Sequence, residues 1–275
     1  MRDMTGLPDV AGKPNWDAWS LPGPLQADQP ALLDPDEPPP FEVINPRGAA
    51  NALLVCDHAS NRLPRRLADL GLTDDQLRQH IAWDPGAAAV ARGLAARLDA
   101  TLILSCYSRL AIDLNRPLES PELIATQSAG IPIPGNQGLS ARDRAARITA
   151  LFLPYHRAIA HWLDAHPDPA LRLLSVHSFT PRLAGQSRPW HLGLAYGRDA
   201  RLAGQLGRIL TQEADLCLGD NEPYRIEDHL DFTLPTHGEG RGIPHVMIEI
   251  RQDGLETPTQ IDAWVERLAL AHAHI

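Results

Sequence analysis

From residue 51 onward, short apolar runs alternate with longer segments in which apolar residues recur at helical spacing. Each run has the length of one buried strand, and each intervening segment is long enough for a helix. The apolar runs lie near residues 51–56, 101–105, 110–114, 172–177, 191–196 and 243–250. This alternation predicts an α/β domain in which helices flank a mixed, mostly parallel sheet.

The clearest helix is predicted to begin after Ser140, which forms a capping-box pattern with Asp143, and to end near His166. Its apolar residues recur at three- and four-residue intervals, as one buried helix face requires. Thr257, followed by Pro258, predicts the start of a helix near the C-terminus. The further predicted helices span 84–98, 199–215 and 257–273.

Two segments lack any apolar period. Residues 1–44 are rich in proline and acidic residues, so we expect an extended or partly disordered lead-in before a single domain over 45–275. Segment 117–138 contains Pro, Gly, Ser, Asn and Gln without a repeat. A loop of that length in a compact domain is often a lid or binding loop, and we expect it to shape a pocket.

Composition restricts the partners. The formal net charge of −9 argues against a nucleic-acid partner, although arginines in a cleft could still attract a small anionic substrate. The sequence has no apolar stretch long enough to span a membrane, and its first residues do not resemble a secretory signal, so we expect a cytoplasmic protein without a membrane partner. Three scattered cysteines, Cys56, Cys106 and Cys217, fit reduced thiols. Nothing in the sequence indicates an oligomeric state.

Two histidines lie where predicted strands end. His58 follows the apolar run at 52–56, and His177 follows the run at 173–176. Ligands and metals collect at strand ends of α/β sheets, and imidazole is a good ligand for zinc. His58 could equally be a histidine of a turn before a capped helix. The serines beside His177 suggest a hydrolase nucleophile, but no Gly-x-Ser-x-Gly turn is present, so we favour His177 as a ligand.

Asp84 has two interpretations, and Asp113 calls for a partner. Asp84 could cap the alanine-rich helix that follows Pro85, or it could be the oxygen ligand that completes a two-histidine site. Asp113 lies in the apolar run 110–114, between Arg109 and Arg116. A carboxylate there needs a partner, and an arginine fork is the best geometric match.

Glu249 lies within the apolar run 243–250. Burying an unpaired carboxylate is costly, and its raised pKa would suit a general base or acid working near neutral pH. Alternatively, Glu249 is simply paired with Arg241 or Arg251.

Several strings together resemble the N-formylglutamate amidohydrolase family, in its amidohydrolase-like branch. They extend over roughly residues 45–270 and occupy 56–61, 80–86, 108–116, 175–179, 188–193, 221–224 and 234–253. The resemblance implies a three-layer α/β/α sandwich, similar to zinc-dependent exopeptidases and phosphorylase/hydrolase-like folds. It also implies a hydrolase that releases formate from N-formyl-L-glutamate at the end of a histidine-degradation route.

A more distant resemblance connects the chain with aspartoacylase-type zinc deacylases. The string 113–116 resembles their substrate-carboxylate motif, and His58, His177 and Glu249 match their first histidine, later histidine and catalytic glutamate. Asn61 stands where that family has a glutamate ligand. The third ligand is therefore either Asp84 or Asn61.

Taken together, these features give the hypothesis of a metal-dependent amidohydrolase for a small N-acyl amino acid, with a divalent metal, zinc, as cofactor. The expected roles are metal binding for His58, Asp84 and His177, proton transfer for Glu249, oxyanion stabilisation for Arg109, α-carboxylate binding for Asn115 and Arg116, and recognition of a side-chain carboxylate by Arg251 or Arg241. The alternatives are a deacylase or amidase for another N-acyl amino acid or small peptide, and a protein that binds an amino-acid derivative without turnover.

Overall fold

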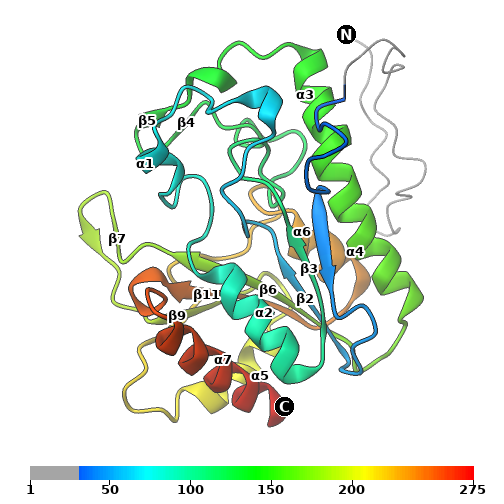
Figure 1. The fold of residues 1–275 in the computed structure, drawn as a ribbon. Coiled ribbons are helices and arrows are strands. Elements are labelled where there is room, and N and C mark those ends of the chain that lie inside the picture. The colour runs from blue at the N-terminus through cyan, green and yellow to red at the C-terminus, as the bar shows by residue number, and fades with distance from the viewer. Residues whose placement is uncertain (1–30) are drawn as a thin grey trace.

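A computed structural model describes residues 31–275, which fold around a seven-stranded mixed sheet (Figure 1). The strand order is β1-β3-β2-β6-β11-β9-β10. β2 runs parallel to β3 and β6, and β11 runs parallel to β6, whereas β1 against β3 and β9 against β11 are antiparallel. The strands are β1 (Phe41–Ile44), β2 (Ala52–Cys56), β3 (Thr101–Ser105), β6 (Arg172–Phe179), β9 (Leu192–Ala195), β10 (Leu218–Asp220) and β11 (His245–Arg251).

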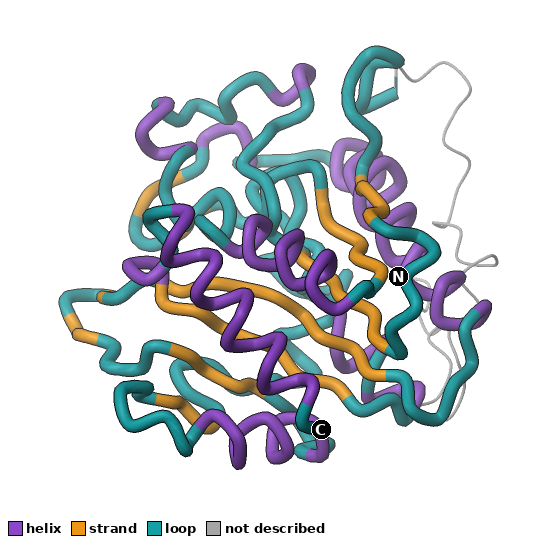
Figure 2. The backbone as a smooth tube through the Cα atoms, turned by 60° about the horizontal axis from the view of Figure 1, so that its bottom comes forward, coloured by secondary structure: helices purple, strands orange, loops and turns teal. Residues whose placement is uncertain are grey.

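Helices cover both faces of the sheet, because alternate strand residues point to opposite sides. Leu54 and Ile248 pack with α2 (Ala87–Leu98), α5 (Arg201–Leu210) and α7 (Pro258–Ala273). Leu53 and Met247 pack with α4 (Leu153–Ala165) and α6 (Thr233–His237) on the other side. α2 and α7 also contact each other, in front of the strands in Figure 2. The predicted three-layer α/β/α architecture with a mostly parallel sheet is confirmed.

A long helical rod runs along the second face. Ser140 caps α3 (Ala141–Arg147) through the predicted capping box with Asp143. A π-helical turn, η3 (Ile148–Phe152), then joins α3 to α4, which ends at Ala165, one residue before the predicted end. This turn closes over one residue more than an α-helical turn, so it rotates the buried face of α4 relative to α3.

The other predicted helices correspond to α2, α5 and α7, and Thr257 caps α7 as expected. Segment 117–138 carries a short hairpin and a single helical turn. The remaining small elements are η1 (Arg65–Leu67), α1 (Asp74–Leu77), β4 (Gln127–Ser128), β5 (Ile131–Pro132), η2 (Pro134–Asn136), β7 (Arg182–Leu183), β8 (Gln186–Ser187), η4 (Glu239–Arg241) and η5 (Gln252–Gly254).

The strand predicted at 110–114 is wrong, because residues 108–116 form consecutive turns. The Ser108 hydroxyl accepts a hydrogen bond from the Leu110 amide, and the Asp113 carboxylate accepts one from the Asn115 amide. Such local side-chain bonds compete with strand pairing. The edge of β3 is instead covered by β1, whose residues belong to the predicted lead-in. Residues 1–30 of that lead-in lie outside the described part of the chain.

None of the helices within residues 31–275 combines the length and the apolar character needed to cross a membrane.

Candidate metal and catalytic site

The strands direct the candidate residues to one face of the sheet. Ser175 and His177 on β6 and Glu249 on β11 alternate with residues of the α2–α7 side, so they point toward α4 and α6. In the parallel register of β6 and β11, Glu249 lies directly opposite His177. His58 follows the adjacent strand β2, which also pairs with β6.

His58, Asp84 and His177 form a compact buried cluster in which one potential ligand atom from each residue lies within 4.8 Å of the others. The Asp84 Oδ2 atom is 2.9 Å from His177 Nδ1 and 3.3 Å from His58 Nδ1. Two imidazole nitrogens and one carboxylate oxygen make a donor set of the kind that catalytic zinc sites use. The donor chemistry of this cluster therefore fits a divalent metal.

The second nitrogen of each imidazole faces a carboxylate of its own. His58 Nε2 is 2.8 Å from Asp113 Oδ1, and His177 Nε2 is 3.2 Å from Asp57 Oδ2. Burial by itself lowers the pKa of both histidines, but these two carboxylates and Asp84 outweigh it, so each pKa lies above its usual value. Such carboxylate partners orient metal-binding imidazoles and select their tautomer. Here they direct both Nδ1 atoms toward Asp84.

Asp57 lies in a cradle of hydroxyl groups. Its Oδ1 accepts hydrogen bonds from Tyr155 (2.8 Å) on α4 and Thr233 (3.0 Å) on α6, and its Oδ2 lies within reach of Ser175. Burial would raise the pKa of Asp57, yet the hydrogen bond and charge of His177 lower it. The cradle thus holds an ionised carboxylate behind His177.

Asp84 enters the cluster and does not cap the next helix, whose N-cap residue is Gly86. Gly86 has a φ of 82°, and a Cβ there would lie 2.5 Å from the Leu255 Cβ, so the turn requires glycine. The charges of His58 and His177 hold the pKa of Asp84 far below its usual range, against the effect of burial.

The alternative ligand Asn61 uses its side-chain amide to donate a hydrogen bond to the Leu77 carbonyl at 3.0 Å.

Arg109 connects the two carboxylates on the outer side of the cluster. Its Nε and Nη2 donate to Asp113 Oδ2 at 2.9 and 2.6 Å, and its Nη1 is 3.7 Å from Asp84 Oδ1. Asp113 therefore has the arginine partner that the sequence led us to expect. The Arg109 side chain is 25% exposed, so part of the guanidinium still faces solvent.

Glu249 has a different environment. Its residue is 5% exposed, and its Oε2 has no hydrogen-bond partner among the described residues. Burial raises its pKa to about 7, despite the opposing charge of His177. The two arginines considered as its partners bind elsewhere: Arg241 pairs with Asp164, and Arg251 with Asp253. A carboxyl group with this pKa is suited to proton transfer near neutral pH.

The residues expected to bind substrate are not all directed to one place. Asn115 donates to Asp231 and accepts from the backbone amides of Phe232 and Thr233, so its amide holds the segment before α6. Arg116 donates to the Leu230 carbonyl at 2.9 Å and lines a cavity.

Arg251 donates to the backbone carbonyls of Arg188 and Pro189. Arg241 lies in η4, which precedes the first residue of β11, and the candidate residue Glu249 lies toward the opposite end of that strand.

A cavity of about 520 Å³ opens beside the cluster. Arg109, Asp113 and Arg116 form one wall and residues from the segment 121–130 form another. The lining also includes His80, Ile81, Leu110, Leu183 and Tyr224. Segment 117–138 thus has the position expected of a binding loop.

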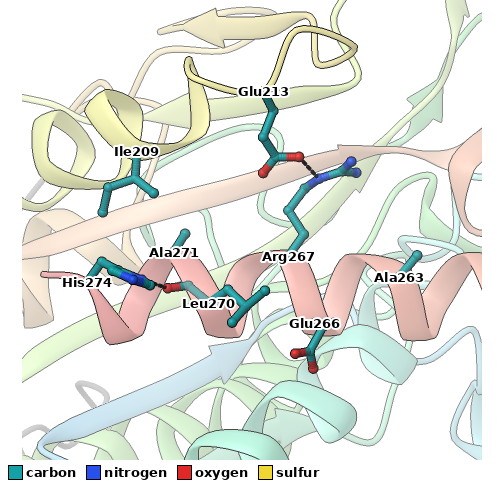
Figure 3. A pocket seen from close by; sticks show the side chains of 8 residues that line it. All are labelled: Ile209, Glu213, Ala263, Glu266, Arg267, Leu270, Ala271 and His274. Atoms are coloured by element: carbon teal, nitrogen blue, oxygen red, sulfur yellow. Dashed lines mark hydrogen bonds and ion pairs between the residues drawn. The ribbon is translucent and has the colours of Figure 1, made fainter.

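A second hollow, between α5 and α7, contains none of the candidate residues (Figure 3). Two of its charged residues, Glu213 and Arg267, form an ion pair at 2.7 Å, and a third, Glu266, pairs with Arg97.

Comparison with protein families now adds an independent observation. The family model described as N-formylglutamate amidohydrolase matches residues 50–255. The chain belongs to this family. As a member of the N-formylglutamate amidohydrolase family it is a hydrolase of an amide bond, which decides against the alternative of a binding protein without turnover. No curated protein sequence matches the chain.

Two solved structures share the fold of this chain. The gene product Atu2144 from Agrobacterium tumefaciens is 35% identical, with a TM-score of 0.84 over 88% of this chain and 96% of its own. N-formylglutamate amidohydrolase from Ralstonia eutropha is 22% identical, with a TM-score of 0.61 over 84% and 95%, and it shares the fold. An aspartoacylase family protein from Mesorhizobium loti is 16% identical, with a TM-score of 0.32 over 87% and 69%.

Sequence reasoning missed the partner of Asp57 and the role of Asp113. Asp57 is adjacent to His58 in the sequence, yet its carboxylate lies behind His177. The available signal was the adjacency of Asp57 and His58, since neighbouring residues at a strand end point to opposite sides. Tyr155, which also holds Asp57, carries no such signal because it is one of several buried residues on a helix face.

Proposed function

We propose that this protein is a metal-dependent amidohydrolase that hydrolyses N-formyl-L-glutamate to formate and glutamate. One observation carries the proposal: Glu249 lies directly opposite His177 of the His58–Asp84–His177 cluster in the strand register. Glu249 is buried, and its Oε2 atom has no hydrogen-bond partner among the described residues. Such a reaction would complete a histidine-degradation route, as the family resemblance implies.

The proposed metal ligands are His58 and His177 through their Nδ1 atoms and Asp84 through its carboxylate, with zinc as the best match for this donor set. When bound, such an ion polarises the amide carbonyl and lowers the pKa of a water molecule. Asp113 and Asp57 would keep the two Nδ1 atoms unprotonated and directed at the ion.

Glu249 is the proposed general base. Its carboxylate would take a proton from the attacking water and deliver that proton to the nitrogen of the leaving amine. A pKa of about 7 leaves a sizeable fraction of the group ionised at neutral pH while keeping it acidic enough to return the proton. The absence of a hydrogen-bond partner at Oε2 within residues 31–275 supports this role, because no other group competes for the oxygen.

Arg109 is the proposed oxyanion stabiliser. It lies on the cavity wall with Asp113 and Asp84 fixing two of its edges, so its orientation is set before the substrate binds. Loss of one such donor costs about 3 kcal/mol of transition-state stabilisation in comparable enzymes.

Arg116 remains the proposed ligand of the α-carboxylate. Asn115 would act by holding the segment that precedes α6.

A deacylase for a longer N-acyl amino acid is a second candidate, favoured by the size of the cavity. A volume of about 520 Å³ lies within the range that holds drug-sized ligands. A formyl group leaves much of such a cavity unfilled.

The test is formate release from N-formyl-L-glutamate by the purified protein, before and after chelation and after readdition of zinc. We expect release that chelation abolishes and zinc restores. Glu249→Gln should reduce kcat by at least about 100-fold, since general acid–base catalysis contributes that much. Glu256→Gln, at an exposed carboxylate, is the matched control. Unchanged turnover in Glu249→Gln would refute the mechanism, and turnover of acetyl but not formyl substrates would favour the second candidate.

A further inference from the structure

Arg188 is a nearly buried cation without a carboxylate partner. The residue is 9% exposed, and within residues 31–275 no acidic side chain lies at ion-pair distance from it. Its guanidinium Cζ lies 5.0 Å from the ring centre of Tyr224 and 5.8 Å from that of Phe179, and its Nη1 donates to the Tyr224 hydroxyl at 2.9 Å. A buried charge that lacks a counterion is costly, which calls for an anionic ligand.

Arg188 lies just beyond the proposed catalytic residues. Phe179 is two residues after His177 on β6, so both side chains are on the same side of the strand. Arg251, the register partner of Phe179 on β11, donates from Nη1 to the Arg188 backbone carbonyl at 3.1 Å. The backbone at Arg188 is therefore fixed relative to the strand that carries Glu249.

The guanidinium of Arg188 is connected to the cavity through Tyr224. Tyr224, its hydrogen-bond partner, lines the cavity together with Arg109 and His80. Burial, Arg109 and Arg188 all lower the pKa of His80. The positive field of Arg188 therefore reaches two residues of the cavity wall.

We propose that Arg188, held between Phe179 and Tyr224, binds the side-chain carboxylate of the substrate. This inference rests on the proposed function and names the residue that would recognise the second carboxylate of its substrate. Arg188 thus takes the role that sequence analysis gave to Arg241 or Arg251. Arg251 becomes a positioning residue that acts through the Arg188 backbone.

The kinetic test compares N-formyl-L-glutamate with N-formyl-L-glutamine, which has the same shape but no side-chain charge. Wild-type protein should prefer the glutamate compound. Arg188→Gln should reduce the ratio of the two kcat/KM values by about 10- to 100-fold, the usual effect of a hydrogen bond to a charged group. The loss should appear in KM for the charged substrate, with the parameters for the glutamine compound unchanged.

Arg182→Gln, an exposed arginine in the same segment, is the matched control and should leave the ratio unchanged. Tyr224→Phe removes only the hydroxyl that orients Arg188, and it should reduce the ratio by a smaller factor. This variant carries the test if Arg188→Gln does not fold. An equal loss for both substrates in either variant would assign Arg188 a purely structural role and overturn the proposal.

Binding of glutarate, measured by calorimetry, separates this inference from the proposed function. If wild-type protein hydrolyses neither formyl compound, the proposed function fails. The carboxylate site still stands in that case if glutarate binds and Arg188→Gln weakens it at least about tenfold. Equal glutarate affinity in wild type and Arg188→Gln, or no glutarate binding by wild type, would overturn the proposal.

Discussion

Asp57→Asn tests the idea that a buried carboxylate selects the tautomer of His177. The substitution keeps the shape of the side chain. Its Oδ1 can still accept from Tyr155 and Thr233, so the new amide nitrogen takes the place of Oδ2, which lies 3.2 Å from His177 Nε2. Two donors cannot face each other there. This contact favours the tautomer of His177 that carries its proton on Nδ1, the atom that the proposed metal site needs unprotonated, while the Ser175 hydroxyl, 2.9 Å from Nε2, can donate to that nitrogen.

The magnitude follows from these contacts. Removal of a carboxylate that orients a metal-binding imidazole reduces metal affinity by about 10- to 100-fold, which corresponds to about 1.4 to 2.7 kcal/mol. In metal-free protein the substitution removes one charge-assisted hydrogen bond to His177, worth about 1.5 to 3 kcal/mol of unfolding free energy. Both losses should occur together, because one interaction causes both.

The assay is zinc affinity by competition with a chromophoric chelator, together with urea unfolding of the metal-free protein. Asp262→Asn, at an exposed carboxylate on α7, is the matched control. A zinc affinity of Asp57→Asn within twofold of wild type would refute the reasoning. A loss of stability without a loss of affinity would restrict Asp57 to a structural role.

Three further predictions concern the same region. Zinc at 100 times its Kd should stabilise the apoprotein by about 2.7 kcal/mol and so raise its Tm. His177→Ala should abolish this increase, and a Tm that does not depend on zinc would contradict the metal site. In metal-free protein, burial raises the folded-state pKa of Glu249 to about 7. The folded state therefore retains a proton that the unfolded state releases near pH 4.5. The free energy of unfolding falls as the pH rises between these two values. Glu249→Gln should remove that slope and be more stable by about 3 kcal/mol at pH 8 in urea titrations, whereas parallel pH profiles would argue against a raised pKa. Arg147→Met should lower the free energy of unfolding in urea by about 3 kcal/mol, because two buried acceptors, the Ala111 carbonyl and the Asn136 side chain, lose their donor. A change below about 0.5 kcal/mol, roughly the effect of a surface substitution, would show that the acceptors find other partners.

Strand ends were predictable because their signals are local. The apolar runs before His58 and His177 and around Glu249 correspond to β2, β6 and β11, and parallel pairing of these strands brings their ends together. Capping boxes at Ser140 and Thr257 likewise depend on residues three positions apart. The family resemblance added the three-layer architecture, which periodicity by itself does not specify.

Features that depend on distant partners were not predictable in the same way. Residues 110–114 have the composition of a strand, but Ser108 and Asp113 satisfy nearby backbone amides and turn the chain. Arg188 looked like any polar residue in a loop, because its importance comes from burial without a counterion, and burial is a property of the folded chain. Arg241 and Arg251 were plausible for the same reason: a sequence does not show that acids such as Asp164 already hold them.

The π-helical turn at Ile148–Phe152 ties the helical geometry of one segment to the chemistry of the centre. If the same residues formed an ordinary α-helix, everything after them would be turned by roughly 100° about the helix axis. Tyr155 would then leave Asp57, which directly follows β2 nearly a hundred positions earlier in the chain. The wide turn therefore sets the angle at which Tyr155 meets Asp57, and forcing this segment into α-helical geometry should impair the centre even though all the candidate site residues remain in the chain.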